Sequence, residues 1–130
     1  MRYSFAFDDR FRLPLRGLGI TESTAYADLG RDHMLVKFGL WTVAMRYDNI
    51  DHLQASGPYA WYRTIGARLS LRDRGLTFGT NADAGVCVFF KKPVTGFDPL
   101  GFIKHPALTL TLADIGGFMN GIEDRYRVAV

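Results

Sequence analysis

The residues that most often carry chemistry are few in this chain and widely spaced. The three histidines, His33, His52 and His105, lie far apart in sequence, and no pair shows the spacing of a metal site. Cys87, the single cysteine, sits inside the apolar run VCVFF, where a thiol behaves as a small hydrophobic side chain. No two carboxylates form an acid–base couple, and no glycine-rich loop has the spacing that cradles phosphate. We therefore expect a non-enzymatic protein without a cofactor or a bound metal.

One group of residues has the composition of a binding surface. It follows a Gly-Pro break and consists of Tyr59, Trp61, Tyr62 and Arg63. Aromatic side chains and arginine are enriched at protein interfaces and at membrane surfaces. The alternative, which ordinary packing favours, is that two of the three rings belong to the core of an irregular strand. A Trp61→Ala substitution separates the two hypotheses, because it should unfold a core strand but only weaken binding at an interface.

A second group consists of cations that bracket a long apolar connection between residues 93 and 106. Lys91 and Lys92 precede the connection, and Lys104 and His105 close it. Long connections in small domains are often functional or are packed by their own side chains. These cations could bracket an anionic ligand or an anionic membrane surface. The alternative is that both ends of the connection are ordinary solvated loop residues.

Composition and charge limit the class of protein further. At 130 residues with 48% hydrophobic and 22% charged residues, the sequence predicts a single globular domain that spans residues 1–130. The net charge is only +3, and the cations are interspersed with acidic residues, so we expect no nucleic-acid partner. We see no signal peptide and no apolar run of membrane-spanning length. The expected location is cytoplasmic, at most peripheral to the membrane.

Short segments in which apolar and polar residues alternate predict strands through much of the chain. Residues 34–45 give the clearest hairpin, with alternation on both arms and a glycine between them. The segment 86–90 is apolar at every position, which indicates a strand covered on both faces. We expect the long connection or a terminal helix to provide that cover. The predicted strands are 3–7, 23–28, 34–38, 41–45, 49–56, 67–71, 76–79, 86–90 and 108–112, and residues 59–63 are an ambiguous strand candidate.

The remaining segments are predicted to be a loop and a helix. A loop is indicated through Pro14, Gly17 and Gly19. After residue 114 the apolar positions recur at helical spacing, and Asp114 is the expected N-cap. This helix contains three glycines, each of which costs about 1 kcal/mol relative to alanine. Its stability must therefore come from docking its apolar face onto the strands.

Three stretches together resemble a bacterial pleckstrin-homology-like (PH-like) domain: MLVKFGLWTVAMRYDNIDHL, RLSLRDRGLTFG and HPALTLTLADIGGFMNGIEDR. The resemblance implies a β-barrel or orthogonal sandwich of about seven antiparallel strands, with the last helix capping one end. Family members that bind phosphoinositides carry a dense basic motif between their first two strands. Arg31 stands alone before Asp32 in the corresponding loop, so the resemblance does not extend to recognition of a lipid headgroup.

The function that these observations favour is that of an interaction module for a protein or peptide partner. An exposed strand edge, or the groove beside the terminal helix, would be the contact surface. The alternative is a carrier that holds a small apolar molecule inside a closed barrel, which the many phenylalanines would suit. Binding of single-stranded nucleic acid is a third hypothesis, weakened by the mixed charges and the terminal helix.

Overall fold

A computed structural model of the chain describes residues 1–70, 74–98 and 100–126. Strands dominate the regular structure of these residues, so the fold is mainly β, as the alternating patterns predicted. The elements in chain order are β1 (Arg2–Ser4), α1 (Asp9–Gly17), β2 (Ala25–Leu29), β3 (His33–Phe38), β4 (Trp41–Arg46), the 3-10 helix η1 (Tyr47–Asn49), β5 (Ile50–Ser56), α2 (Trp61–Thr64), β6 (Gly66–Leu69), β7 (Leu76–Gly79), β8 (Gly85–Val94), β9 (His105–Leu110) and α3 (Ile115–Arg125).

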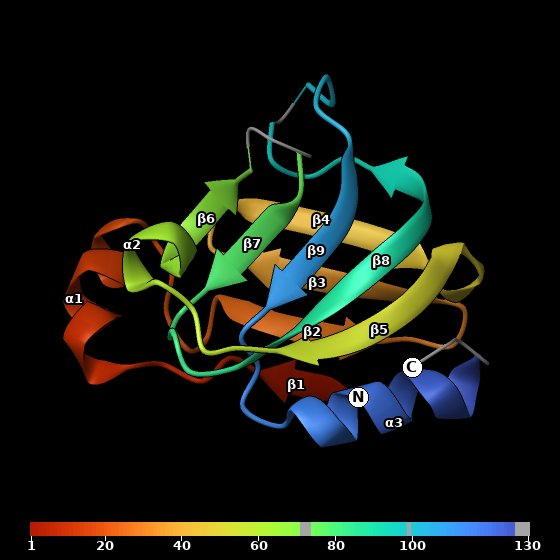
Figure 1. Ribbon diagram of the computed structural model, residues 1–130, viewed down its shortest axis with the longest axis horizontal. Coiled ribbons are helices and arrows are strands. Elements are labelled where there is room, and N and C mark those ends of the chain that lie inside the picture. The colour runs from red at the N-terminus through yellow and green to blue at the C-terminus, as the bar shows by residue number, and fades with distance from the viewer. Residues whose placement is uncertain (71–73, 99, 127–130) are drawn as a thin grey trace.

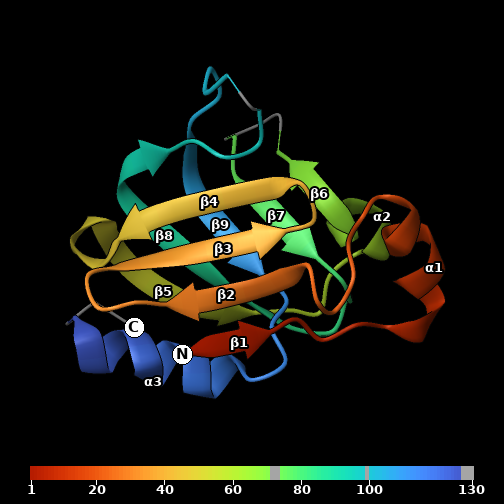
Figure 2. The same cartoon turned by 180° about the vertical axis from the view of Figure 1, so that it is seen from behind.

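The strands form two sheets that face each other, with the order β1-β2-β3-β4 in the first and β5-β8-β9-β7-β6 in the second. Strands of the two sheets cross obliquely (Figures 1 and 2). The sandwich form of our expectation therefore agrees with the structure, whereas the barrel form and the count of about seven strands do not. The described residues hold nine strands, divided between separate sheets. The expectation that every pair is antiparallel fails once, because β7 and β9 run parallel.

The hairpin predicted at residues 34–45 is confirmed as β3 and β4. Phe38 and Trp41 are register partners across a two-residue turn. Gly39 in that turn has a φ of 62°, a conformation that favours glycine. Val36 and Phe38 are fully buried, while Lys37 between them is only half-buried. One face of this hairpin therefore belongs to the core, as its alternation predicted.

The two edges of the first sheet differ. At the β1 edge, Phe5 forms a bridge with Leu112, just after β9. The Ala6 N–H also donates to the carbonyl of Thr111 at 3.0 Å. These contacts join the two sheets at one corner of the sandwich, so that β4 remains as the open edge of the first sheet.

β8 carries the apolar run of the second sheet, and its two faces are covered unequally. Val88 is fully buried, whereas Cys87 and Phe89 are half-buried. Phe89 stacks on His52 of β5, with 4.1 Å between the ring centroids. The expectation that the long connection or the terminal helix covers this second face is wrong. The connection packs against β4 and the helix packs against β1.

Helix α1 occupies a segment where the sequence indicates a loop through residues 14–19. The Asp8 carboxylate caps this helix by accepting the backbone N–H of Arg10 at 3.0 Å. Leu15 is buried and Phe11, four residues earlier, is half-buried. The loop prediction is wrong because packing of these two apolar side chains outweighs the local preference of the proline and glycines.

Helix α3 lies alongside β1 and covers that side of the sandwich in both views (Figures 1 and 2). Phe118 and Ile122 are fully buried, and Phe118 meets the Tyr3 ring edge-on with centroids 5.7 Å apart. The Tyr3 hydroxyl donates to the Gly117 carbonyl at 3.0 Å. The Asp114 carboxylate accepts the Gly117 N–H at 2.9 Å, so the predicted terminal helix and its N-cap are both confirmed.

Aromatic stacking holds the two sheets together, and a buried polar contact joins the ends of β7 and β9 within the second sheet. Phe38 of β3 stacks on Phe78 of β7, with centroids 4.7 Å apart and an angle of 11° between the ring planes. Near this stack the Thr80 N–H donates to the Thr111 hydroxyl at 2.9 Å, and both residues are fully buried. The interior between the sheets is therefore filled by side chains, and the buried side-chain nitrogen and oxygen atoms of the described residues have hydrogen-bond partners.

Candidate functional site

Helices α1 and α2 lie side by side at one end of the molecule (Figure 1) and present what we call the aromatic–arginine face, formed by Arg10, Phe11, Trp61, Tyr62 and Arg63. Phe11 stacks on Trp61 with centroids 5.9 Å apart, and Tyr62 meets Trp61 edge-on at 5.9 Å. The Arg10 guanidinium lies 5.1 Å from the Phe11 ring, and that of Arg63 lies 5.8 Å from the Tyr62 ring. The rings and cations thus form one continuous surface.

The exposure of this face tests the hypothesis that residues 59–63 belong to the core. Trp61 is 55% exposed and Tyr62 is 58% exposed. The expectation that two of the three rings belong to the core is therefore wrong. Large aromatic rings gain free energy when they are buried, so a stacked group of them in contact with water is typical of an interaction surface.

Tyr59 is the ring of this segment that does not join the face. It is half-buried, and its hydroxyl hydrogen-bonds to the Ser56 hydroxyl. Burial raises the pKa of the Tyr59 phenol. The Tyr59 oxygen also approaches Gly85, where an added Cβ would lie 2.7 Å from it. Tyr59 therefore packs between β5 and β8, and its role in the structure is to anchor the chain that leads into α2.

Helix α2 is short, and the residue at its end holds it in place. Thr64 is buried, and its hydroxyl donates to the Ala60 carbonyl at 3.0 Å. The backbone of Thr64 lies so close to β7 that a Cβ added to Gly79 would be 1.9 Å from its carbonyl oxygen. This contact turns the rest of α2 outward, and Trp61 meets Phe11 of α1 there.

The two arginines of the face differ in their electrostatic surroundings. Arg10 Nη2 lies 2.9 Å from the Asp8 carboxylate, and this hydrogen bond holds the pKa of Asp8 below its usual value. Arg63 forms no ion pair with any described carboxylate and instead lies over the Tyr62 ring. The face therefore carries one compensated and one uncompensated positive charge.

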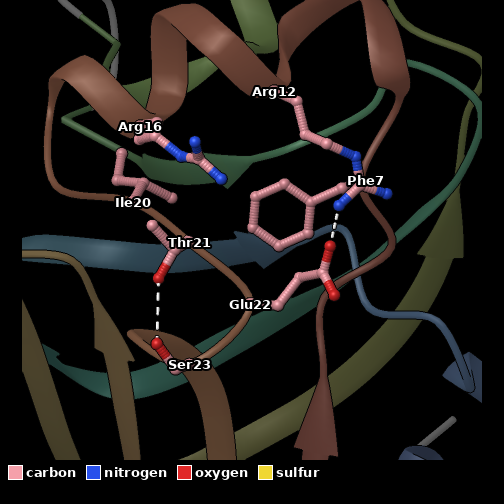
Figure 3. A pocket seen from close by; sticks show the side chains of 7 residues that line it. All are labelled: Phe7, Arg12, Arg16, Ile20, Thr21, Glu22 and Ser23. Atoms are coloured by element: carbon pink, nitrogen blue, oxygen red, sulfur yellow. Dashed lines mark hydrogen bonds and ion pairs between the residues drawn. The ribbon is translucent and has the colours of Figure 1, made fainter.

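A hollow of about 320 Å³ lies on the other side of α1 (Figure 3). Arg12 and Arg16, one helical turn apart, flank the ring of Phe7, and Arg12 is paired with Glu22 across the hollow. The hydroxyls of Thr21 and Ser23 hydrogen-bond to each other at its lower rim. Arg16 adds a cation to the end of the molecule that bears the aromatic–arginine face. Arg12, in contrast, forms ion pairs with Asp9 and Glu22.

The structure separates the three lysines that the sequence grouped. Lys91 and Lys92 lie on β8 and line a hollow of about 520 Å³ beside β4, together with Arg46. The backbone N–H and C=O of Lys92 both bond to the Asn49 amide at 2.9 Å, which holds this part of β8 in place. Lys104 is exposed at the end of the connection and does not line that hollow.

The long connection between β8 and β9 is organised by Asp98. Its carboxylate accepts the N–H of Phe102 at 2.7 Å and that of Ile103 at 2.9 Å. These backbone hydrogen bonds hold the pKa of Asp98 below its usual value. The turn leaves Leu100 and Phe102 at 76% and 80% exposed. His105 holds the connection in place, because its side chain is fully buried and its Nε2 accepts the Phe97 N–H at 3.2 Å.

The sequence pattern indicated Trp61 and Tyr62 as candidates but not their partners Arg10 and Phe11. The reason is that the proline and glycines of this segment predicted a loop where α1 lies. The signal that could have found them is the four-residue spacing of Phe11 and Leu15 after Asp8, a good N-cap residue. Contact between α1 and α2 is a long-range feature that no local pattern contains.

No family model, curated protein or solved structure matches this chain. In the part of the chain that the structure describes, no three His, Cys, Asp or Glu side chains are grouped so that they could hold a metal ion. Within the same residues no helix is long and apolar enough to cross a membrane. The function must therefore be argued from the surface itself.

Proposed function

We propose that this protein is a non-enzymatic interaction module that binds a protein partner through the aromatic–arginine face. The observation that carries the proposal is the Phe11–Trp61 stack, 5.9 Å between centroids, in which Trp61 remains 55% exposed. Tryptophan, tyrosine and arginine supply most of the residues that dominate binding energy at protein interfaces. All three types occur here in one contiguous patch.

The free energy available at this face is sufficient for specific binding. Covering the exposed parts of Trp61 and Tyr62 would remove on the order of 200 Å² from water, which corresponds to ~5 kcal/mol before the cost of association. The stack with Phe11 restricts the Trp61 ring before a partner arrives. Less conformational entropy is then lost on binding.

Photocrosslinking in the native host tests this proposal. A benzophenone amino acid replaces Tyr62, and the matched control replaces Tyr26, a half-buried tyrosine on β2 in the first sheet. We expect a discrete crosslinked protein from position 62 and not from position 26. The same crosslink should disappear when Trp61→Ala is added.

Two results would overturn the proposal. One is the absence of any crosslink at position 62 above that at position 26. The other is a crosslink at position 62 that persists at full yield in the Trp61→Ala variant, because the ring would then contribute nothing to recognition.

A further inference from the structure

A second binding surface follows the open edge of β4, away from the aromatic–arginine face. In the first sheet a two-residue turn joins β3 to β4. Phe38 and Trp41, which flank this turn, therefore form a pair that exchanges backbone hydrogen bonds. Along two antiparallel strands, residues that bond to the neighbouring strand alternate with residues that do not. The N–H and C=O groups of Thr42, Ala44 and Arg46 therefore point away from β3. In agreement, the Thr42 carbonyl oxygen lies 3.3 Å from the position of a Cβ added to Gly96.

The outward backbone groups of β4 have no partner strand. Hydrogen bonds between described residues include none from Thr42, Ala44 or Arg46 to the segment 94–98 that passes nearby. An unpaired edge of this kind is a template on which another strand can form. The edge is six residues long, or about 20 Å, which is long enough to pair with a peptide segment of similar length.

Two hollows accompany this edge along its length, and we call them together the edge groove. One, of about 580 Å³, lies beside Trp41, and the other, of about 520 Å³, lies beside Arg46. Val43 and Gly96 separate them, since a Cβ added to Gly96 would lie 2.3 Å from Val43 Cγ2. Side chains of an added strand would therefore meet one hollow at each end of β4 and a constriction between the two hollows.

The hollow beside Trp41 is apolar. Trp41 stacks on Phe97 with 6.4 Å between the ring centroids, and Leu40 at its rim is 89% exposed. The carboxylate of Asp98, which also lines this hollow, is already occupied by two backbone N–H groups. An aromatic or large aliphatic side chain fits this environment.

The hollow beside Arg46 is cationic. Lys91, Lys92 and Arg46 line it, and Asp48 is the one carboxylate among the described residues there. Asp48 lies 3.4 Å from the Arg46 Nε, so the two lysines remain without a carboxylate partner in the described structure. Both lysines are exposed, and Lys91 lies 5.8 Å from the Tyr126 ring. Carboxylate side chains complement this charge.

We infer that the edge groove binds an extended peptide segment, which adds a strand to β4 and places an aromatic or large aliphatic side chain beside Trp41 and acidic side chains beside Lys91 and Lys92. Main-chain hydrogen bonds to Thr42, Ala44 and Arg46 hold the segment, and the two hollows select its side chains. Because the apolar hollow lies beside Trp41 and the cationic hollow extends from Ala44 to Arg46, the apolar and acidic positions lie about three to five residues apart. This surface is separate from the aromatic–arginine face, so the inference does not rest on the proposed function.

Selection from a phage-displayed library of random dodecapeptides tests the inference on the full chain. The wild type is compared with Lys91→Glu/Lys92→Glu. A control with the same change in charge is Arg31→Glu/Lys104→Glu, because Arg31 and Lys104 line neither hollow. Thermal melts of both double variants establish that they are folded. We expect peptides with an apolar residue about three to five positions from acidic residues, enriched on the wild type and on the control variant but not on Lys91→Glu/Lys92→Glu.

Titration of the strongest synthetic peptide into ¹⁵N-labelled protein then locates the site. The amides of Thr42, Ala44 and Arg46 should shift, and the dissociation constant should rise about tenfold or more when alternate peptide amides are N-methylated. The inference is overturned if no sequence is enriched, if the enriched peptides lack acidic residues or bind both double variants equally, or if the shifts map to the aromatic–arginine face.

Discussion

A binding role and a structural role of Trp61 predict different effects of Trp61→Ala on the free energy of unfolding. Because its ring is 55% exposed, Trp61→Ala should lower the free energy of unfolding by about 1–3 kcal/mol, the value of its two aromatic pairs with Phe11 and Tyr62. Phe118→Ala, at a fully buried ring, should cost about 3–5 kcal/mol. Urea denaturation of both variants measures this difference. Equal losses would show that Trp61 belongs to the core.

Asp98 gives a pH-dependent prediction for the turn that exposes Leu100 and Phe102. Its pKa is lowered by the N–H groups of Ile103 and Phe102, so the ionised form is favoured in the folded state. The stabilising contribution is therefore complete above the unfolded value of about 3.9, and it is lost as the pH falls through the folded pKa. The amide shifts of Phe102 and Ile103, followed by NMR, should titrate with a midpoint below about 3.9. A midpoint above this value would contradict the assignment.

At the scale of single residues, the sequence indicated some members of the site but did not indicate their exposure or all of their partners. The segment 59–63 was recognisable because aromatic and arginine residues are concentrated in it. Exposure of its rings could not be predicted, because it depends on how Thr64 packs against Gly79 on a distant strand. Phe11 was missed for a similar reason, since its partner Trp61 is 50 residues away in sequence.

Among the elements, α3 depends on its N-cap because it contains three glycines. Asp114 accepts the Gly117 N–H, and Asp114→Ala should lower the free energy of unfolding by about 0.5–2 kcal/mol. Asp124→Ala, near the other end of the same helix, is the matched control and should have a smaller effect. Circular dichroism during thermal unfolding measures both. A larger effect from Asp124→Ala would mean that the cap does not limit the stability of α3.

Elements with one buried face were predictable, and the helix α1 was not. β3 and β4 alternate in sequence because one face is buried, and the structure shows that face in the core. α1 has one fully buried residue, Leu15, so its apolar pattern is too short to outweigh a proline and a glycine in a local reading. Tertiary contacts with α2 and the core supply the remaining stability.

At the scale of the whole molecule, a buried hydrogen bond joins the ends of β7 and β9, the parallel pair of the second sheet. The Thr80 N–H donates to the Thr111 hydroxyl at 2.9 Å, and Thr111→Val keeps the shape but removes this acceptor. Leaving the buried N–H unsatisfied should cost about 1–3 kcal/mol. Thr109→Val, at a half-buried position on β9 two residues before Thr111, is the control and should cost less. Denaturant unfolding distinguishes them, and equal costs would contradict a linking role for Thr111.

Division of the strands into two sheets lay beyond sequence reasoning. Local alternation located most strands, but a barrel and a sandwich use the same strands and differ only in which of them pair. The parallel pairing of β7 with β9 and the Phe5–Leu112 bridge join segments that are far apart in the chain. Those pairings decide the architecture, and they leave β4 as the open edge that borders the edge groove.

The most direct test of the proposed function is the affinity of the partner recovered by crosslinking at position 62. Its dissociation constant should be measured for the wild type, for Trp61→Ala and for Tyr26→Ala as the control. We predict that Trp61→Ala weakens binding about tenfold or more while the variant remains folded, and that Tyr26→Ala binds like the wild type. Equal affinities of Trp61→Ala and the wild type would contradict the account, because the exposed ring would then have no part in recognition.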